Sequence, residues 1–76
     1  MEPTLRIDAT GQLCPLPVIE LARRIGDVEI GAVVEVLADD PAAATDLPAW
    51  CRMRHQEFVG AVQDEGATAY LIRRLR

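Results

Sequence analysis

The pattern of hydrophobic and polar positions divides this chain into four strand-like segments and two helix-like segments. Residues 5–8 alternate strictly between apolar and polar side chains, which is typical of a strand that buries one face. Residues 32–38 form a valine-rich and mostly apolar run, which is typical of an internal strand. The pattern predicts strands over residues 4–8, 32–38, 58–63 and 68–73.

The two helix-like segments each start at a proline, which suits the first helical position because its missing N–H would have no partner there. Residues 15–24 form the first segment, with an apolar face made by Val18, Leu21, Ala22 and Ile25. Residues 41–54 form the second, with Asp40 as the expected N-cap. Pro48 lies inside the second segment and predicts either a kink or two shorter helices.

The resulting order is β-α-β-α-β-β, which predicts an α+β fold. We expect a two-layer α/β sandwich, in which a four-stranded mixed sheet carries two helices on one face. The first two strands should be parallel, joined by a right-handed crossover through the first helix. The last two should form an antiparallel hairpin around Gly66. The length predicts a single domain over residues 1–76.

Composition and charge narrow the classes of function. Half of the residues are hydrophobic, and eight basic against twelve acidic side chains leave a net charge of −4. An acidic balance argues against direct binding of nucleic acid, which needs a basic face. No apolar run approaches the ~20 residues of a membrane span, and residues 1–4 lack the features of a signal peptide. We therefore expect a cytoplasmic protein that does not contact a membrane.

The candidate chemistry lies in a glycine turn that leads into a cysteine and two prolines, Gly11-Gln12-Leu13-Cys14-Pro15-Leu16-Pro17-Val18. The pattern places Cys14 at the N-cap, with Pro15 at N1 and Pro17 at N3, where prolines stiffen the first turn. We expect its sulfur to lie beside the free N–H groups of Leu16 and Val18, at the positive end of the helix dipole. Such a position favours the thiolate, which is the nucleophilic form of cysteine. The alternative is a small buried hydrophobic residue that happens to precede a helix.

Residues 8–18 resemble the CPxP signature of the TusA/SirA-like sulfur-carrier family. A second stretch is similar to the second helical segment of that family, Asp39-Asp40-Pro41 followed by Asp46-Leu47-Pro48-Ala49-Trp50-Cys51. The resemblance covers essentially the whole chain and implies the same architecture. The motif residues expected to support Cys14 are Gly11, Leu13, Pro15, Leu16 and Pro17.

The resemblance also implies a function. Cys14 would accept sulfane sulfur as a persulfide from a donor protein, such as a cysteine desulfurase or a rhodanese-like protein, and pass it to an acceptor protein. The acceptor routes of the family include tRNA thiolation, molybdenum-cofactor maturation and oxidative sulfur metabolism. We expect a sulfurtransferase-type carrier that works as a monomer with these two protein partners and without a cofactor.

Two alternatives use other features of the chain. A dithiol redox protein would pair Cys14 with Cys51, although Pro17 occupies the position of the partner thiol in a Cys-x-x-Cys motif. A small regulatory or interaction module would need no reactive cysteine at all. Cys51 itself is interpreted as a packing residue on the apolar face of the second helix. Cys51 and His55 are four residues apart, but two ligands are too few for a structural zinc site, and we expect no metal.

The chain ends in a short basic segment that contains Arg73, Arg74 and Arg76. One interpretation is a charged sheet edge that discourages pairing with other strands. The other is a contact surface for an acidic partner protein.

Overall fold

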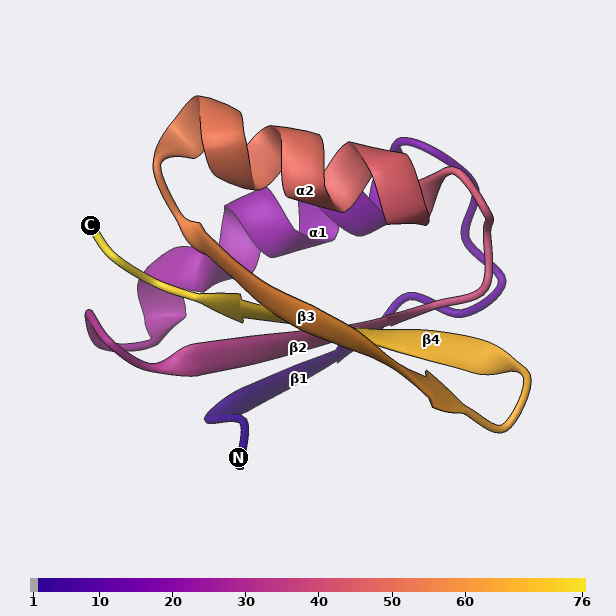
Figure 1. The fold of residues 1–76 in the computed structure, drawn as a ribbon, viewed down its shortest axis with the longest axis horizontal. Helices are drawn as coiled ribbons and strands as arrows, with labels where there is room; N and C mark the ends of the chain where they lie inside the picture. The colour runs from indigo at the N-terminus through magenta and orange to yellow at the C-terminus, as the bar shows by residue number, and fades with distance from the viewer. Residues whose placement is uncertain (1) are drawn as a thin grey trace.

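A computed structural model of the chain describes residues 2–76. Its elements follow the order β1 Leu5–Asp8, α1 Leu16–Arg24, a 3-10 turn η1 Ile25–Asp27, β2 Val33–Ala38, α2 Ala43–Arg54, β3 Glu57–Asp64 and β4 Ala67–Arg73. The strands form one layer, and α1 and α2 lie side by side on one face of it (Figure 1). The predicted two-layer fold is therefore confirmed, with element ends that move by one or two residues.

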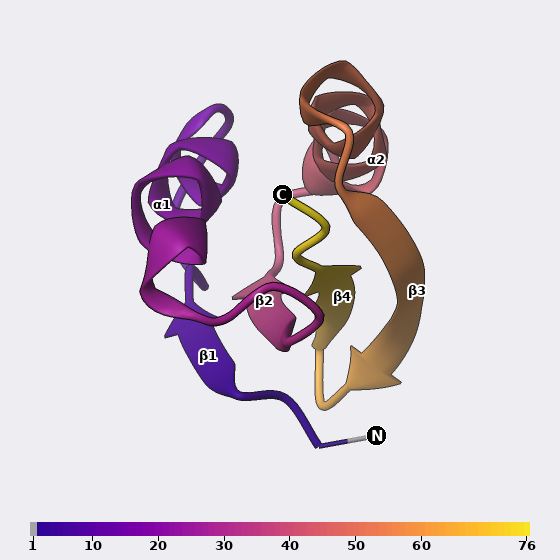
Figure 2. The same cartoon turned by 90° about the vertical axis from the view of Figure 1, so that its left-hand side faces the viewer.

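The strands form a single mixed sheet in the order β1-β2-β4-β3. β1 runs parallel to β2, with Ile7 opposite Val36. β4 pairs antiparallel with β2 on one side and with β3 on the other. The end-on view in Figure 2 shows α1 above the β1 side of the sheet and α2 above the β3 side.

The core lies between the sheet and the two helices. Alternate residues of the strands point toward the helices, and the apolar faces of the helices cover them. The side chains that are almost completely buried at this contact include Val34, Val36, Ile72, Leu21 and Leu47. Burial of these aliphatic side chains is the main term that stabilises a domain of this size.

Pro48 does not divide the second helical segment, because α2 continues through it from Ala43 to Arg54. Proline removes the N–H that would bond the carbonyl of Ala44. Ala44 is exposed, so water can bond that carbonyl instead. The alternative of two shorter helices is therefore wrong, because the helix is continuous through Pro48. Among residues 2–76, no helix has the length and apolar character needed to cross a membrane.

The parallel pairing of β1 and β2 decides where the candidate chemistry lies. Parallel neighbours end at the same edge of a sheet, so the segments that follow them leave side by side. The backbone N–H of Ala9 still donates to the carbonyl of Leu37 (2.8 Å), which holds the two exits together. Figure 1 shows the connections after β1 and after β2 running next to each other toward the starts of α1 and α2.

Candidate functional site

Cys14 is exposed and lies in the turn that leads into α1. The helix begins at Leu16 with Pro15 as its N-cap, so the prediction that Cys14 caps the helix is wrong by one residue. The N–H of Leu16 donates to the carbonyl of Leu13 (2.8 Å) rather than pointing freely at the sulfur. Pro17 consequently lies at the second helical position, where its ring is buried.

The turn before Cys14 depends on Gly11, which has a φ of 78°. This left-handed conformation costs glycine little and strains other residues. The N–H of Gly11 donates to the carboxylate of Asp39, at 3.0 Å to Oδ1 and 3.2 Å to Oδ2. The loop that follows β1 is therefore held by a side chain that follows β2.

Asp40 ties the cysteine itself to the segment before α2. Its Oδ2 accepts a hydrogen bond of 2.6 Å from the backbone N–H of Cys14, and its Oδ1 accepts one of 3.2 Å from Ala42. The N-cap of α2 is Ala42, so the prediction that Asp40 caps this helix is wrong. Asp40 instead fixes the backbone at Cys14, with a charged acceptor that makes a strong bond.

The thiol of Cys14 faces a third carboxylate, that of Asp46 in the first turn of α2. Cys14 Sγ donates to Asp46 Oδ2 over 2.8 Å. This contact raises the pKa of the Cys14 thiol above its ordinary value, first through the hydrogen bond and then through partial desolvation and the negative charges of Asp46 and Asp40. The direction of this shift favours the thiol over the thiolate.

This protonation state corrects the expectation that the helix dipole favours the thiolate at Cys14. The dipole supplies about half a positive charge at a helix N-terminus, and its effect fades within one turn. Asp46 places a full negative charge in contact with the sulfur, and Asp40 adds another close by. The carboxylates outweigh the dipole because Coulomb energy grows with charge and with proximity.

Beside the thiol lies a pocket of about 330 Å³ between the start of α1 and the middle of α2. Its lining is mostly apolar and consists of Cys14, Pro15, Val18, Asp46, Ala49, Trp50 and Met53. Large exposed apolar side chains accompany this pocket. Met53 lines it and is 70% exposed. Leu13, which is 71% exposed, and the exposed Leu16 and Ile19 lie within five residues of Cys14 in the sequence. We call Leu13, Leu16, Ile19 and Met53 the apolar rim. Exposed apolar groups of this size commonly mark a surface that another protein covers.

Comparison with known proteins places this site in a family. The sequence model described as Sulfurtransferase TusA matches residues 5–74 of the chain. The chain belongs to the TusA family of sulfur carriers. The resemblance seen in the sequence is thereby confirmed.

Individual relatives agree with this assignment to the TusA family. A putative sulfur carrier protein of Archaeoglobus fulgidus is 34% identical over 70 residues, which cover 92% of this chain and 96% of the relative. The sulfur carrier protein TusA of Pseudomonas entomophila is 35% identical over 68 residues, covering 90% of this chain and 85% of that protein. The crystal structure of a SirA-like protein from Desulfitobacterium hafniense superposes with a TM-score of 0.82 at 28% identity, and the match covers 96% of this chain and 100% of that one.

The second cysteine of this TusA-family chain lies in a different environment. Cys51 is 1% exposed and packs in the core, and it is a free thiol like Cys14. Burial raises the pKa of the Cys51 thiol to about 11. His55 is exposed and ends α2 in a left-handed conformation with a φ of 59°. Within residues 2–76, no three His, Cys, Asp or Glu side chains gather as a metal site would require.

The site contains three side chains that the sequence analysis of this TusA-family chain did not assign to it, Asp39, Asp40 and Asp46. Asp39 and Asp40 follow β2 directly, and β2 was expected to run parallel to β1. Polar residues that follow two parallel neighbours meet at one edge of the sheet. That signal was available for the first two carboxylates, whereas the position of Asp46 depends on how α2 packs.

The different environments of the two cysteines predict an order of reaction. Iodoacetamide at neutral pH should label Cys14 first, because its sulfur is exposed, and leave Cys51 unlabelled until the protein unfolds. Cleavage after arginine places Cys14 in residues 7–23 and Cys51 in residues 25–52, so peptide mapping separates the two. Faster labelling of Cys51 in the native protein would contradict the assignment of Cys14 as the reactive thiol.

Proposed function

We propose that this TusA-family protein carries sulfane sulfur as a persulfide on Cys14. The observation that carries the proposal is an exposed thiol that two carboxylates hold in place and that lines a mostly apolar pocket, which a protein partner can cover. The donor would be a protein with a cysteine persulfide of its own, such as a cysteine desulfurase or a rhodanese-like protein. The acceptor would be a second protein that takes the sulfur from Cys14.

The loading step is an exchange between sulfurs without net oxidation or reduction. Cys14 Sγ attacks the terminal sulfur of the donor persulfide, and a new S–S bond forms while the donor S–S bond breaks. The electron pair of the broken bond stays on the donor sulfur, which leaves as a thiolate. The thiol proton of Cys14 passes to that leaving thiolate, and the Asp46 carboxylate is the acceptor within reach on the way. The products are a Cys14 persulfide and a donor thiol.

The carboxylates around Cys14 suit a carrier that meets its partners one after another. A thiol held in its protonated form reacts slowly with small oxidants and electrophiles in solution. The hydrogen bonds from Gly11 and Cys14 to Asp39 and Asp40 hold the loop in one conformation, so the sulfur is presented in the same place to each partner. The apolar rim offers the contact area, and the reducing cytoplasm suits a carrier whose two cysteines are both free.

The acidic side chain beside Cys14 indicates whether the sulfur acceptor is a protein or a nucleic acid. In the part of the chain that the structure describes, the pocket beside Cys14 is lined by the acidic Asp46 and by no basic side chain. A phosphate backbone would be repelled there, because nucleic-acid binding relies on cations. In tRNA thiolation the sulfur would therefore pass through an acceptor protein, as it also would in molybdenum-cofactor maturation or oxidative sulfur metabolism.

The dithiol redox alternative is not favoured by the position of Cys51. Its side chain is 1% exposed and belongs to the core cluster formed by the sheet and both helices. A resolving thiol must reach the sulfur that it attacks and must ionise to do so. Burial and a pKa of about 11 oppose both requirements at Cys51.

Mass spectrometry after incubation with a cysteine desulfurase and L-cysteine tests the proposal. We expect the mass of one added sulfur atom on the peptide of residues 7–23, and its loss after treatment with dithiothreitol. A Cys51→Ala variant serves as the control and should load equally. Sulfur on residues 25–52, an internal disulfide, or no sulfur at all would each contradict the carrier function of Cys14.

A further inference from the structure

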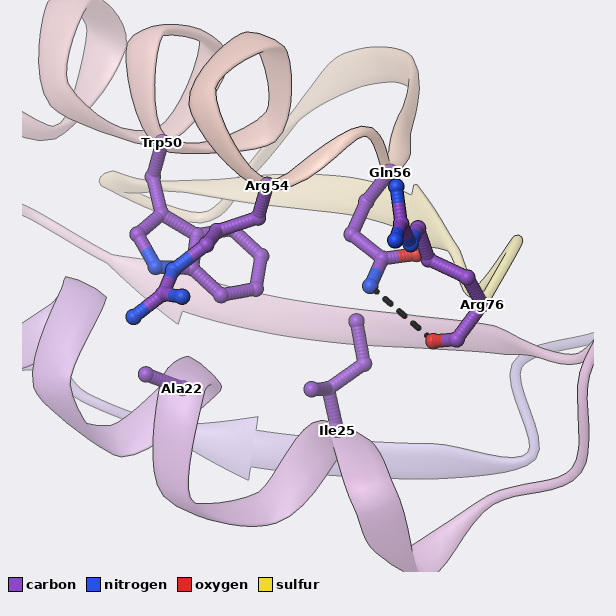
Figure 3. A pocket seen from close by; sticks show the side chains of 6 residues that line it. All are labelled: Ala22, Ile25, Trp50, Arg54, Gln56 and Arg76. Atoms are coloured by element: carbon purple, nitrogen blue, oxygen red, sulfur yellow. Dashed lines mark hydrogen bonds between the residues drawn. The ribbon is translucent and has the colours of Figure 1, made fainter.

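A second pocket, of about 370 Å³, lies between α1 and α2 toward the ends of both helices (Figure 3). Its lining comes from three separate parts of the chain and consists of Ala22, Ile25, Trp50, Arg54, Gln56 and Arg76. Trp50 also lines the pocket beside Cys14, so the two pockets share this side chain. We call the second pocket the arginine pocket.

The charged side chains of the arginine pocket are basic, although the protein is negative overall. Among residues 2–76, the charged side chains of this pocket are those of Arg54 and Arg76, and no aspartate or glutamate lines it. Within residues 2–76, the ion pairs involve four other arginines, Arg6, Arg23, Arg24 and Arg73. Two guanidinium groups without an ion-pair partner thus lie at one pocket, although the chain has a net charge of −4.

Hydrogen bonds hold the segment that carries Arg76 against the rest of the fold. Gln56 Nε2 donates to the carbonyl of Arg76 (3.3 Å), as Figure 3 shows, and Gln56 Oε1 accepts from the N–H of Leu75 (2.7 Å). Arg74 Nη1 donates to the carbonyl of Val28 (2.6 Å). Hydrogen bonds to Gln56 and Val28 therefore hold the backbone of residues 74–76 in place beside the pocket.

The apolar part of the lining lies next to these charges. Figure 3 shows Trp50 and Arg54 pointing from α2 toward α1, with Ala22 and Ile25 rising from below. A guanidinium group matches a carboxylate because its planar N–H fork can donate to both oxygens. The apolar wall can contact the carbon chain that carries the carboxylate, or an apolar group next to that carboxylate. The lining thus fits an organic carboxylate better than a small inorganic anion.

We propose that the arginine pocket binds an acidic side chain of a protein that docks at Cys14. This proposal rests on the proposed function, because the shared wall at Trp50 matters only if a partner covers the cysteine. A carboxylate of the partner would meet the guanidinium group of Arg54 beside Trp50 or that of Arg76 beside Gln56, while an apolar neighbour in the partner packs toward Ile25. A polyanion such as RNA fits less well, since Asp39, Asp40 and Asp46 surround the adjacent site and would repel it.

A peptide titration tests the chemistry of the pocket without any sulfur transfer. The probes are acetyl-Leu-Glu-Leu-amide and its uncharged counterpart acetyl-Leu-Gln-Leu-amide, added to the full ¹⁵N-labelled chain. We expect the glutamate peptide alone to shift the Trp50 indole and Arg54 side-chain signals. An Arg54→Gln, Arg76→Gln double variant should lose these shifts, whereas the control Arg52→Gln, on the same helix but outside the lining, should keep them. Equal shifts with both peptides, no shifts, or shifts that survive the double substitution would overturn the proposal.

Sulfur loading from a cysteine desulfurase tests the role in docking. The double variant should need a several-fold higher concentration for half-maximal loading and should respond less to added salt, because it lacks the charge attraction. Its maximal rate and the alkylation of Cys14 should match the wild type, since neither arginine touches the thiol. If the wild type loads normally and the double variant loads in the same way, the proposal about the arginine pocket is refuted, while the carrier function is not. Failure of the wild type to load would refute the carrier function, and the peptide titration would still judge the pocket.

Discussion

Replacement of Cys14 by serine should abolish sulfur loading and leave the fold intact. The hydroxyl of serine can donate to Asp46 as the thiol does, but oxygen cannot form the persulfide. Because Cys14 is exposed and contributes no side chain to the core, the midpoint of urea unfolding should match that of the wild type. Loading is measured by intact mass after incubation with a desulfurase and L-cysteine, and unfolding by Trp50 fluorescence.

The matched control is the same substitution at the other cysteine. Cys51→Ser should still load sulfur on Cys14, but it places a hydroxyl in the core, where an unsatisfied polar group costs about 1–3 kcal/mol of unfolding free energy. The two serine variants should therefore show opposite phenotypes, one defective in chemistry and the other in stability. Loss of the native fold in Cys14→Ser, or residual loading by that variant, would show that Cys14 has been assigned the wrong role.

The substitution Asp46→Asn should lower the pKa of Cys14 and make its thiol more reactive at neutral pH. In the wild type, the pKa is raised by the hydrogen bond to the Asp46 carboxylate, by desolvation and by the charges of Asp46 and Asp40. An amide keeps the shape of the side chain but removes the negative charge that disfavours the thiolate. The thiolate then forms at lower pH, so the alkylation profile of Cys14 should move to lower pH. At pH 7 the alkylation rate should rise several-fold.

Iodoacetamide kinetics between pH 6 and 10 measure this profile for each variant. The control Asp27→Asn changes the net charge by the same amount at an exposed residue that pairs with Arg24, away from the thiol. It should leave the profile in place, since exposed charges that are not in contact are largely screened by salt. A profile that stays unchanged in Asp46→Asn, or that moves to higher pH, would mean that the carboxylate does not govern the protonation of Cys14.

The fold and the exposure of Cys14 were predictable because their signals are local. Alternation over residues 5–8 and the valine run before Asp39 indicate strands, since side chains on a strand alternate between its two faces. Glycine before Cys14 and prolines after it indicate a turn that leads into a helix. Each signal depends on neighbours within a few residues, and each of these elements is present in the structure.

The chemical state of Cys14 was decided by residues that lie 26 and 32 positions away along the chain, Asp40 and Asp46. They reach the cysteine because β1 and β2 are parallel neighbours and α2 packs beside α1. The local pattern supplied only the helix dipole, which predicted the wrong direction of the pKa shift. The arginine pocket likewise joins α1, α2 and the end of the chain. Sequence alone therefore determined which elements form and which cysteine is exposed, whereas tertiary packing decided its protonation, because electrostatic energy depends on distance through space rather than along the chain.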